Sequence, residues 1–281
     1  MKRMGVIVFL AILIIQPTLA DAFINDQLYK RHQLQQQGSQ LAKKGRYKEA
    51  IEKFREALDP KYIQDEDDKA FSLGKITQIL VLLEEYDQAL KEYEWFVEQS
   101  EKNSMRQGVK NNGKARLRAE EIKALKAYQE TGDSAPIQEY IKRYQERNAK
   151  SLPPDFQWGV GSVEVSTVLR LYDTIGDYDA GVKYVDEIMG FLQQRKKSRK
   201  EDYKIYERIK TADEAKRCAD DNKPAKDRHP EWRACKIIFA YLSVREGFEH
   251  DKQYGRLDCK GESVCLGSAT KALIDSDYFP W

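Results

Sequence analysis

LYKRHQLQQQGSQLAKKGRYKEAIEKFREALDP, residues 28–60, carries small and apolar side chains at helical spacing in each of its halves. The two faces consist of Leu34, Gly38 and Leu41, and of Tyr47, Ala50, Phe54 and Ala57. Gly45 lies between them and is the residue type that ends a helix. Because Gly38 and Ala50 are small, two antiparallel helices can approach closely there, while Tyr47 and Phe54 fill the space beside them. The stretch predicts a helical hairpin.

This hairpin closely resembles a tetratricopeptide repeat. The Gly, Gly-x-Tyr, Ala, Phe and Ala positions of that family are matched here by Gly38, Gly45, Tyr47, Ala50, Phe54 and Ala57. A second unit follows in FSLGKITQILVLLEEYDQALKEYEWFVEQ, residues 71–99, where Tyr86, Ala89, Tyr93 and Phe96 repeat the spacing. Glu84 stands where the turn glycine of this second unit would be.

The same spacing of residues continues, with fewer matches, around Gly132 and Gly176. The turn positions 45, 84, 132 and 176 are 39, 48 and 44 residues apart, which is longer than the usual spacing of about 34, so we expect insertions in the connecting loops. Since one hairpin cannot bury its apolar face alone, the resemblance implies an all-α fold, a solenoid of stacked hairpins. We expect two repeats in 23–100, degenerate hairpins in 101–200, and a helical hairpin with a cap in 201–281.

The N-terminus has the three parts of a secretory signal peptide. Lys2 and Arg3 precede an apolar run over residues 6–15, and small residues follow around Ala20 and Ala22. The run is too short for a membrane-spanning helix, which needs about 20 residues. We expect a signal peptide over residues 1–22, cleavage near Ala20 or Ala22, and a periplasmic or secreted mature chain without a transmembrane segment.

The cysteines all lie in the last quarter of the chain, at Cys218, Cys235, Cys259 and Cys265. In an exported protein an even number of cysteines is typical of disulfides. Their spacing fits neither a zinc site nor haem attachment. Three pairings are open, and 218 with 235 plus 259 with 265 is the simplest. The first of these bonds would join helices expected near 202–219 and 231–248.

Signatures of catalysis, cofactor binding and metal binding are missing from the sequence. The motifs H-E-x-x-H, G-x-S-x-G and G-x-x-x-x-G-K-[ST] do not occur. The histidines His32, His229 and His250 lie far apart along the chain. We interpret the acidic run at 65–68 as helix capping rather than a calcium loop, and the basic run at 195–200 as a helix end. We therefore expect no catalytic residues, no metal and no cofactor.

In tetratricopeptide proteins the first helix of each hairpin lines a concave groove that binds partner segments. Carried over by this resemblance, the groove would contain His32, Gln35, Ser39, Lys43, Phe71, Gln78 and Val81, joined from the weaker repeats by Lys126, Arg170 and Asp173. Aromatic and amide side chains of this kind suit an extended or helical peptide. The net charge of +2 argues against a dedicated nucleic-acid binder.

These observations favour a non-catalytic exported scaffold that binds a protein or peptide through its groove, in envelope assembly or secretion. We do not expect a small-molecule ligand. A second class remains open, a cell-wall or carbohydrate binding protein that uses Trp158 and Trp232 as stacking platforms. A third class is an enzyme, which would require carboxylates that converge in a closed pocket with perturbed ionisation.

Overall fold

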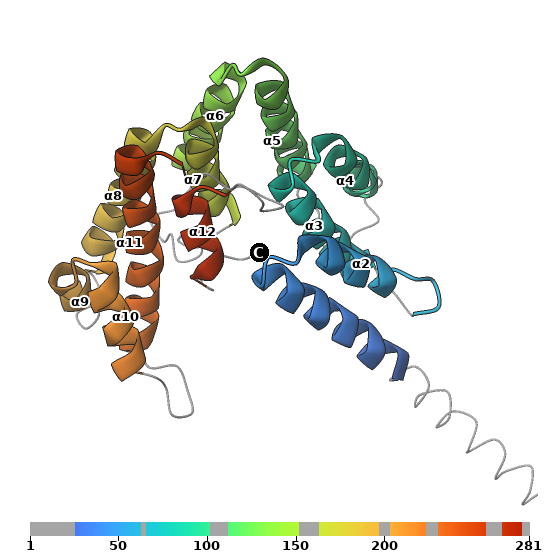
Figure 1. Ribbon diagram of the computed structural model, residues 1–281, viewed down its shortest axis with the longest axis horizontal. Helices are drawn as coiled ribbons and strands as arrows, with labels where there is room; N and C mark the ends of the chain where they lie inside the picture. Colours follow the sequence, from blue (N-terminus) through green and yellow to red (C-terminus); the bar gives the residue numbers. More distant parts are fainter. Residues whose placement is uncertain are drawn as a thin grey trace, which may run out of the picture. The chain divides into compact units, whose positions relative to one another are not determined.

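The computed structural model describes residues 26–62, 66–101, 112–151, 163–196, 203–222, 230–256 and 266–276. These residues form α-helices joined by turns, and none of them lies in a β-strand (Figure 1). The all-α prediction is therefore confirmed. The expected signal peptide, Trp158, His229, Cys259 and Cys265 lie outside the described residues. The chain divides into two compact units, Met1–Lys123 and Ala124–Trp281, and each is described by itself.

The first unit consists of helical hairpins. A helix over residues 26–43 is followed by α2 (Tyr47–Ala57), α3 (Glu66–Leu82), α4 (Tyr86–Glu101) and the greater part of α5 (Asn112–Thr131). Helix α3 packs against both α2 and α4. Helix α3 begins at Glu66, so residues 66–68 of the acidic run lie in its first turn.

The first hairpin shows the close helix approach that its small residues predict. Ala50 and Phe54 are fully enclosed. A methyl group placed on Gly38 would lie 3.0 Å from ring carbons of Phe54. The ring thus occupies the space that the missing side chain leaves, and the small residue at 38 is a packing requirement.

The four turn positions named from the sequence share one backbone conformation. Gly45, Gly132 and Gly176 have φ of 72°, 71° and 72°, and Glu84 has φ of 60°. At 45, 84 and 176 the backbone N–H of the following residue donates to the carbonyl of the residue five positions before that donor. Arg46 donates to Leu41 in this way, and Glu85 donates to Leu80. This is the hydrogen bond of a glycine-type helix end. Glu84 therefore replaces a glycine in function as well as in position.

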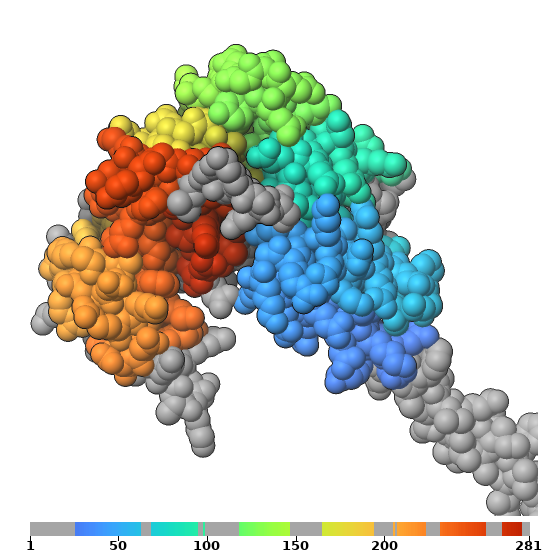
Figure 2. Space-filling view, in the orientation of Figure 1, coloured from blue at the N-terminus to red at the C-terminus, as the bar shows by residue number. Residues whose placement is uncertain are grey.

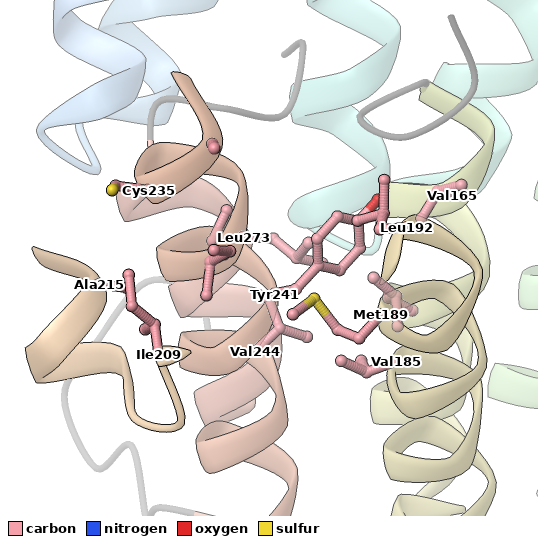
Figure 3. Close-up of a cluster of buried hydrophobic side chains, with 14 of the residues drawn as sticks. Val165, Val185, Met189, Leu192, Ile209, Ala215, Cys235, Tyr241, Val244 and Leu273 are labelled. Carbon is pink, nitrogen blue, oxygen red and sulfur yellow. The ribbon is translucent and has the colours of Figure 1, made fainter. Parts of the chain in front are cut away.

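The second unit is built around one hydrophobic core. Its helices after α5 are α6 (Ala135–Ser151), α7 (Val163–Ile175), α8 (Tyr178–Lys196), α9 (Tyr203–Arg208), α10 (Ala212–Asp221), α11 (Pro230–Tyr254) and α12 (Ser268–Asp275). Buried side chains of α7 to α12 meet in this core, as Figure 3 shows for Val165, Met189, Tyr241 and Leu273. Helices from both sides of the expected boundary at 200, α8 before it and α9 to α12 after it, contribute side chains to this core.

The C-terminal hairpin is tied by the disulfide that the sequence suggested. Cys218 of α10 and Cys235 of α11 are bonded, with their Cα atoms 5.8 Å apart. The single helix expected near 202–219 is wrong, because the chain leaves the helix after Arg208 and starts again at Ala212. Thr211 caps the new helix: its side chain accepts from the Glu214 N–H, and the Glu214 carboxylate accepts from the Thr211 N–H.

The described residues include neither a candidate membrane span nor a cluster of metal ligands. No helix among them is long and apolar enough to cross a membrane. No three histidine, cysteine or acidic side chains in the described ranges come together in a way that could hold a metal ion.

Candidate functional site

The residues that the resemblance placed in a groove differ widely in exposure. His32, Lys43 and Phe71 are exposed, and helix 26–43 forms part of the blue surface in Figure 2. Ser39, Gln78, Lys126 and Arg170 are half-buried, whereas Gln35, Val81 and Asp173 are buried. The groove residues from His32 to Val81 lie in the first unit, and Lys126, Arg170 and Asp173 lie in the second. We call the surface of helix 26–43 and α3 that carries Lys43, Phe71 and Lys75 the N-terminal face.

Gln35 holds two helices together rather than facing a partner. Its side-chain amide donates to the hydroxyl of Ser72 in α3, at 3.1 Å, and both side chains are buried. Ser39 donates its hydroxyl to the backbone carbonyl of Gln35, at 2.9 Å. These bonds are made within the chain, so neither group is offered to a ligand in this conformation. The bond from Gln35 to Ser72 fixes helix 26–43 against α3, whereas the bond from Ser39 stays within helix 26–43.

The ring of Phe71 packs against Phe54 and is also partly exposed to solvent. Its ring meets the buried ring of Phe54 edge-on, with centroids 6.4 Å apart and planes at 69°. Even so, 45% of Phe71 is exposed. An aromatic ring held in place by the core and open to solvent is the kind of anchor that dominates binding energy at protein interfaces.

Lys75, one turn after Phe71, is the residue of this face that the sequence reasoning missed. It is half-buried, and its ammonium lies 5.8 Å from the centre of the Phe71 ring. Burial, together with the nearby charge of Lys43, lowers the pKa of Lys75 to about 8. No carboxylate acts on it from the part of the chain that the structure describes. The feature of the sequence that could have identified Lys75 is its position, because it is a lysine inside the mostly apolar stretch 71–83.

A second cluster of polar groups lies in the second unit, at the start of α12. Asp251 of α11 accepts hydrogen bonds from the backbone N–H of Ser268, at 2.6 Å, and from its hydroxyl. Asp173 of α7 accepts from the backbone N–H of Thr270, at 3.1 Å, and from its hydroxyl. Two carboxylates therefore satisfy N–H groups in the first turn of α12.

Asp173 is closely enclosed by α12. A methyl group on Gly267 would collide with its carboxylate. Burial raises the pKa of Asp173, despite the hydrogen bonds from Thr270 and the charge of Arg256. Its Oδ1 accepts no hydrogen bond within the described ranges. Asp173 and Asp251 are buried acids, and the charge of Asp251 acts on Asp173. Three of their four carboxylate oxygens accept hydrogen bonds from the start of α12, so this cluster has a structural role in this conformation.

The remaining side chains of interest make local contacts. Lys126 pairs with Glu130 on its own helix, at 3.6 Å. Trp232, a candidate stacking platform, packs partly against the core of the second unit, and Lys236 lies 5.0 Å from its ring centre. His250 lies 3.1 Å from Asp251, beside the α12 cluster.

Comparisons with protein families, with curated proteins and with solved structures find no match for this chain.

Proposed function

We propose that the protein is a non-catalytic, exported scaffold of tetratricopeptide-like hairpins that binds a segment of a protein partner on its N-terminal face. The observation that carries this proposal is Phe71, which is supported by the core through Phe54 and still exposed. A rigid aromatic side chain loses little conformational entropy on binding, so it contributes strongly to affinity.

The repeat class is supported by local geometry. Gly45, Glu84, Gly132 and Gly176 all have positive φ. The small residue three positions after the tyrosine also recurs, as Ala50 after Tyr47 and Ala89 after Tyr86, both fully buried. Gly181 holds the same place after Tyr178, and a methyl group there would collide with the ring of Phe248. One set of packing positions is therefore used at three places.

Export is supported by chemistry at both ends of the chain. The bond between Cys218 and Cys235 is of the kind that persists in oxidising compartments. The charged, apolar and small-residue segments of 1–22 form the pattern that a signal peptidase recognises. These two features together support a location in the periplasm or outside the cell, where the proposed partner would be bound.

Affinity purification of the tagged, natively exported protein after mild crosslinking tests the proposal. Phe71→Ala removes the anchor, and Phe191→Ala is the matched control, because Phe191 is also an exposed phenylalanine, 39% exposed against 45%, on a helix of the other unit. We expect a partner that the wild type and Phe191→Ala retain and Phe71→Ala loses. A partner kept by Phe71→Ala would place binding elsewhere, and the absence of any crosslinked partner would contradict the scaffold function.

A further inference from the structure

The ammonium of Lys75 has an environment that is unusual for a lysine. It is half-buried in α3, and the charged side chain that acts on it within the described ranges is Lys43, which carries the same sign. Its Nζ lies over the face of the Phe71 ring, 5.8 Å from the ring centre. Lys75 makes no ion pair within the described ranges, and no described carboxylate acts on its charge.

This arrangement is costly for the free protein. Burying an ammonium is unfavourable unless an opposite charge or several acceptors compensate, and a second lysine nearby adds repulsion. Three other lysines of the first unit pair with acidic residues: Lys30 with Asp26, Lys53 with Glu56 and Lys61 with Asp59. An anion supplied from outside would offset both penalties at Lys75, the burial of its charge and the repulsion from Lys43.

We propose that the N-terminal face binds an acidic segment of a protein partner, with a carboxylate on Lys75 and Lys43 and an apolar side chain on the exposed side of Phe71. This inference rests on the proposed function and names its ligand chemistry. The Phe71 ring offers apolar area to the partner, and the two lysines attract its carboxylate.

The spacing of these groups also limits the partner's sequence. The Lys75 nitrogen and the Phe71 ring centre are 5.8 Å apart. Side chains two residues apart on one face of an extended peptide are separated by about 7 Å, which is close to this distance. We therefore expect an acidic residue and an apolar residue two positions apart, as in a Glu-x-Leu segment.

The test measures binding of labelled dodecapeptides to the mature chain by fluorescence anisotropy. The peptides are acetylated and amidated, and they carry repeated Glu-x-Leu, Gln-x-Leu or Lys-x-Leu. We expect the Glu peptide to bind about tenfold more tightly than the Gln peptide at low salt, since hydrogen bonds between charged groups are the stronger ones. This preference should shrink between pH 7 and 9.5, because Lys75, whose pKa is about 8 in the free protein, loses its charge in that range.

Two variants locate the effect. Lys75→Gln should bring the affinities for the Glu and Gln peptides to within about twofold of each other. Only the exposed Lys43 would then favour the Glu peptide. Lys91→Gln changes an exposed lysine of α4 and should leave the preference unchanged. Circular dichroism of each variant checks that the helices are intact.

The possible outcomes separate the two proposals. If all three peptides fail to bind, the proposed function fails at this face. If the Glu and Gln peptides bind equally, or if the preference survives Lys75→Gln, peptide binding stands and the acidic specificity is overturned. A single-stranded DNA oligonucleotide of equal charge that binds more tightly than the Glu peptide, and depends on Lys75, would overturn it in favour of a nucleic-acid site.

Discussion

Replacing Lys75 by methionine should stabilise the protein, because the lysine is charged in an environment that disfavours charge. Its pKa is about 8 in the folded chain and 10.5 for an unperturbed lysine. A lowered pKa means that the unfolded state binds the proton more tightly, so the folded state is penalised wherever the unfolded lysine is charged. The two values correspond to a penalty of about 3 kcal/mol at pH 7 and about 1 kcal/mol at pH 10. Methionine has a similar length and carries no charge.

Urea unfolding of the mature chain, followed by far-ultraviolet circular dichroism, measures this difference. We expect Lys75→Met to exceed the wild type in free energy of unfolding at pH 7, by up to about 3 kcal/mol, and the gap to narrow as the pH approaches 10. Lys91→Met, at an exposed position, should change stability by less than about 0.5 kcal/mol at both pH values. A gap of equal size at pH 7 and pH 10 would refute the argument, as would a methionine variant that is less stable at pH 7.

Four further outcomes are expected. Glu84→Gly should stabilise the first unit by about 0.5–1 kcal/mol in urea unfolding, because φ is 60° there, and a loss of stability would contradict this view of the turn. Ala50→Leu should destabilise by roughly 1–3 kcal/mol, since the site is fully enclosed, and an unchanged Tm would argue against the hairpin packing. The stability of the wild type relative to Asp173→Asn should rise as the pH falls from 7 toward 4, because a raised carboxyl pKa means that the folded state takes up the proton more readily; a constant difference would show that burial does not perturb this group. Mass spectrometry of the exported protein should find Cys218 and Cys235 in one disulfide-linked peptide pair, and free thiols at both positions would contradict either the bond or the compartment.

Glu84 shows how far local reasoning reaches in this fold. Spacing alone assigned it the role of a turn glycine, although glutamate rarely adopts positive φ. The backbone at 84 nevertheless matches that at 45 and 176, including the hydrogen bond from the following residue. The repeat spacing thus predicted the backbone conformation at 84 better than the preference of glutamate did, because packing of the flanking helices fixes the turn.

The break between α9 and α10 could also have been anticipated. Thr211-Ala212-Asp213-Glu214 is a capping-box sequence, and it lies in the middle of the helix expected over 202–219. The prediction relied on helical composition across the stretch and overlooked the start signal inside it. The pairing of Cys218 with Cys235, by contrast, was among the alternatives from the start, because it is the simplest of the three connectivities.

The sequence by itself determined the helices, the turns and the small residues between helices, because these depend on backbone preferences and on spacing within a few turns. The tertiary structure alone decided which polar residues are buried and what they touch. Asp173 bonds Thr270 across 97 residues, and Gln35 bonds Ser72 across 37. Lys75 gains its lowered pKa from enclosure and from Lys43 on another helix. Burial and charge interactions depend on every group nearby in space, and such neighbours carry no mark in the local pattern of the chain.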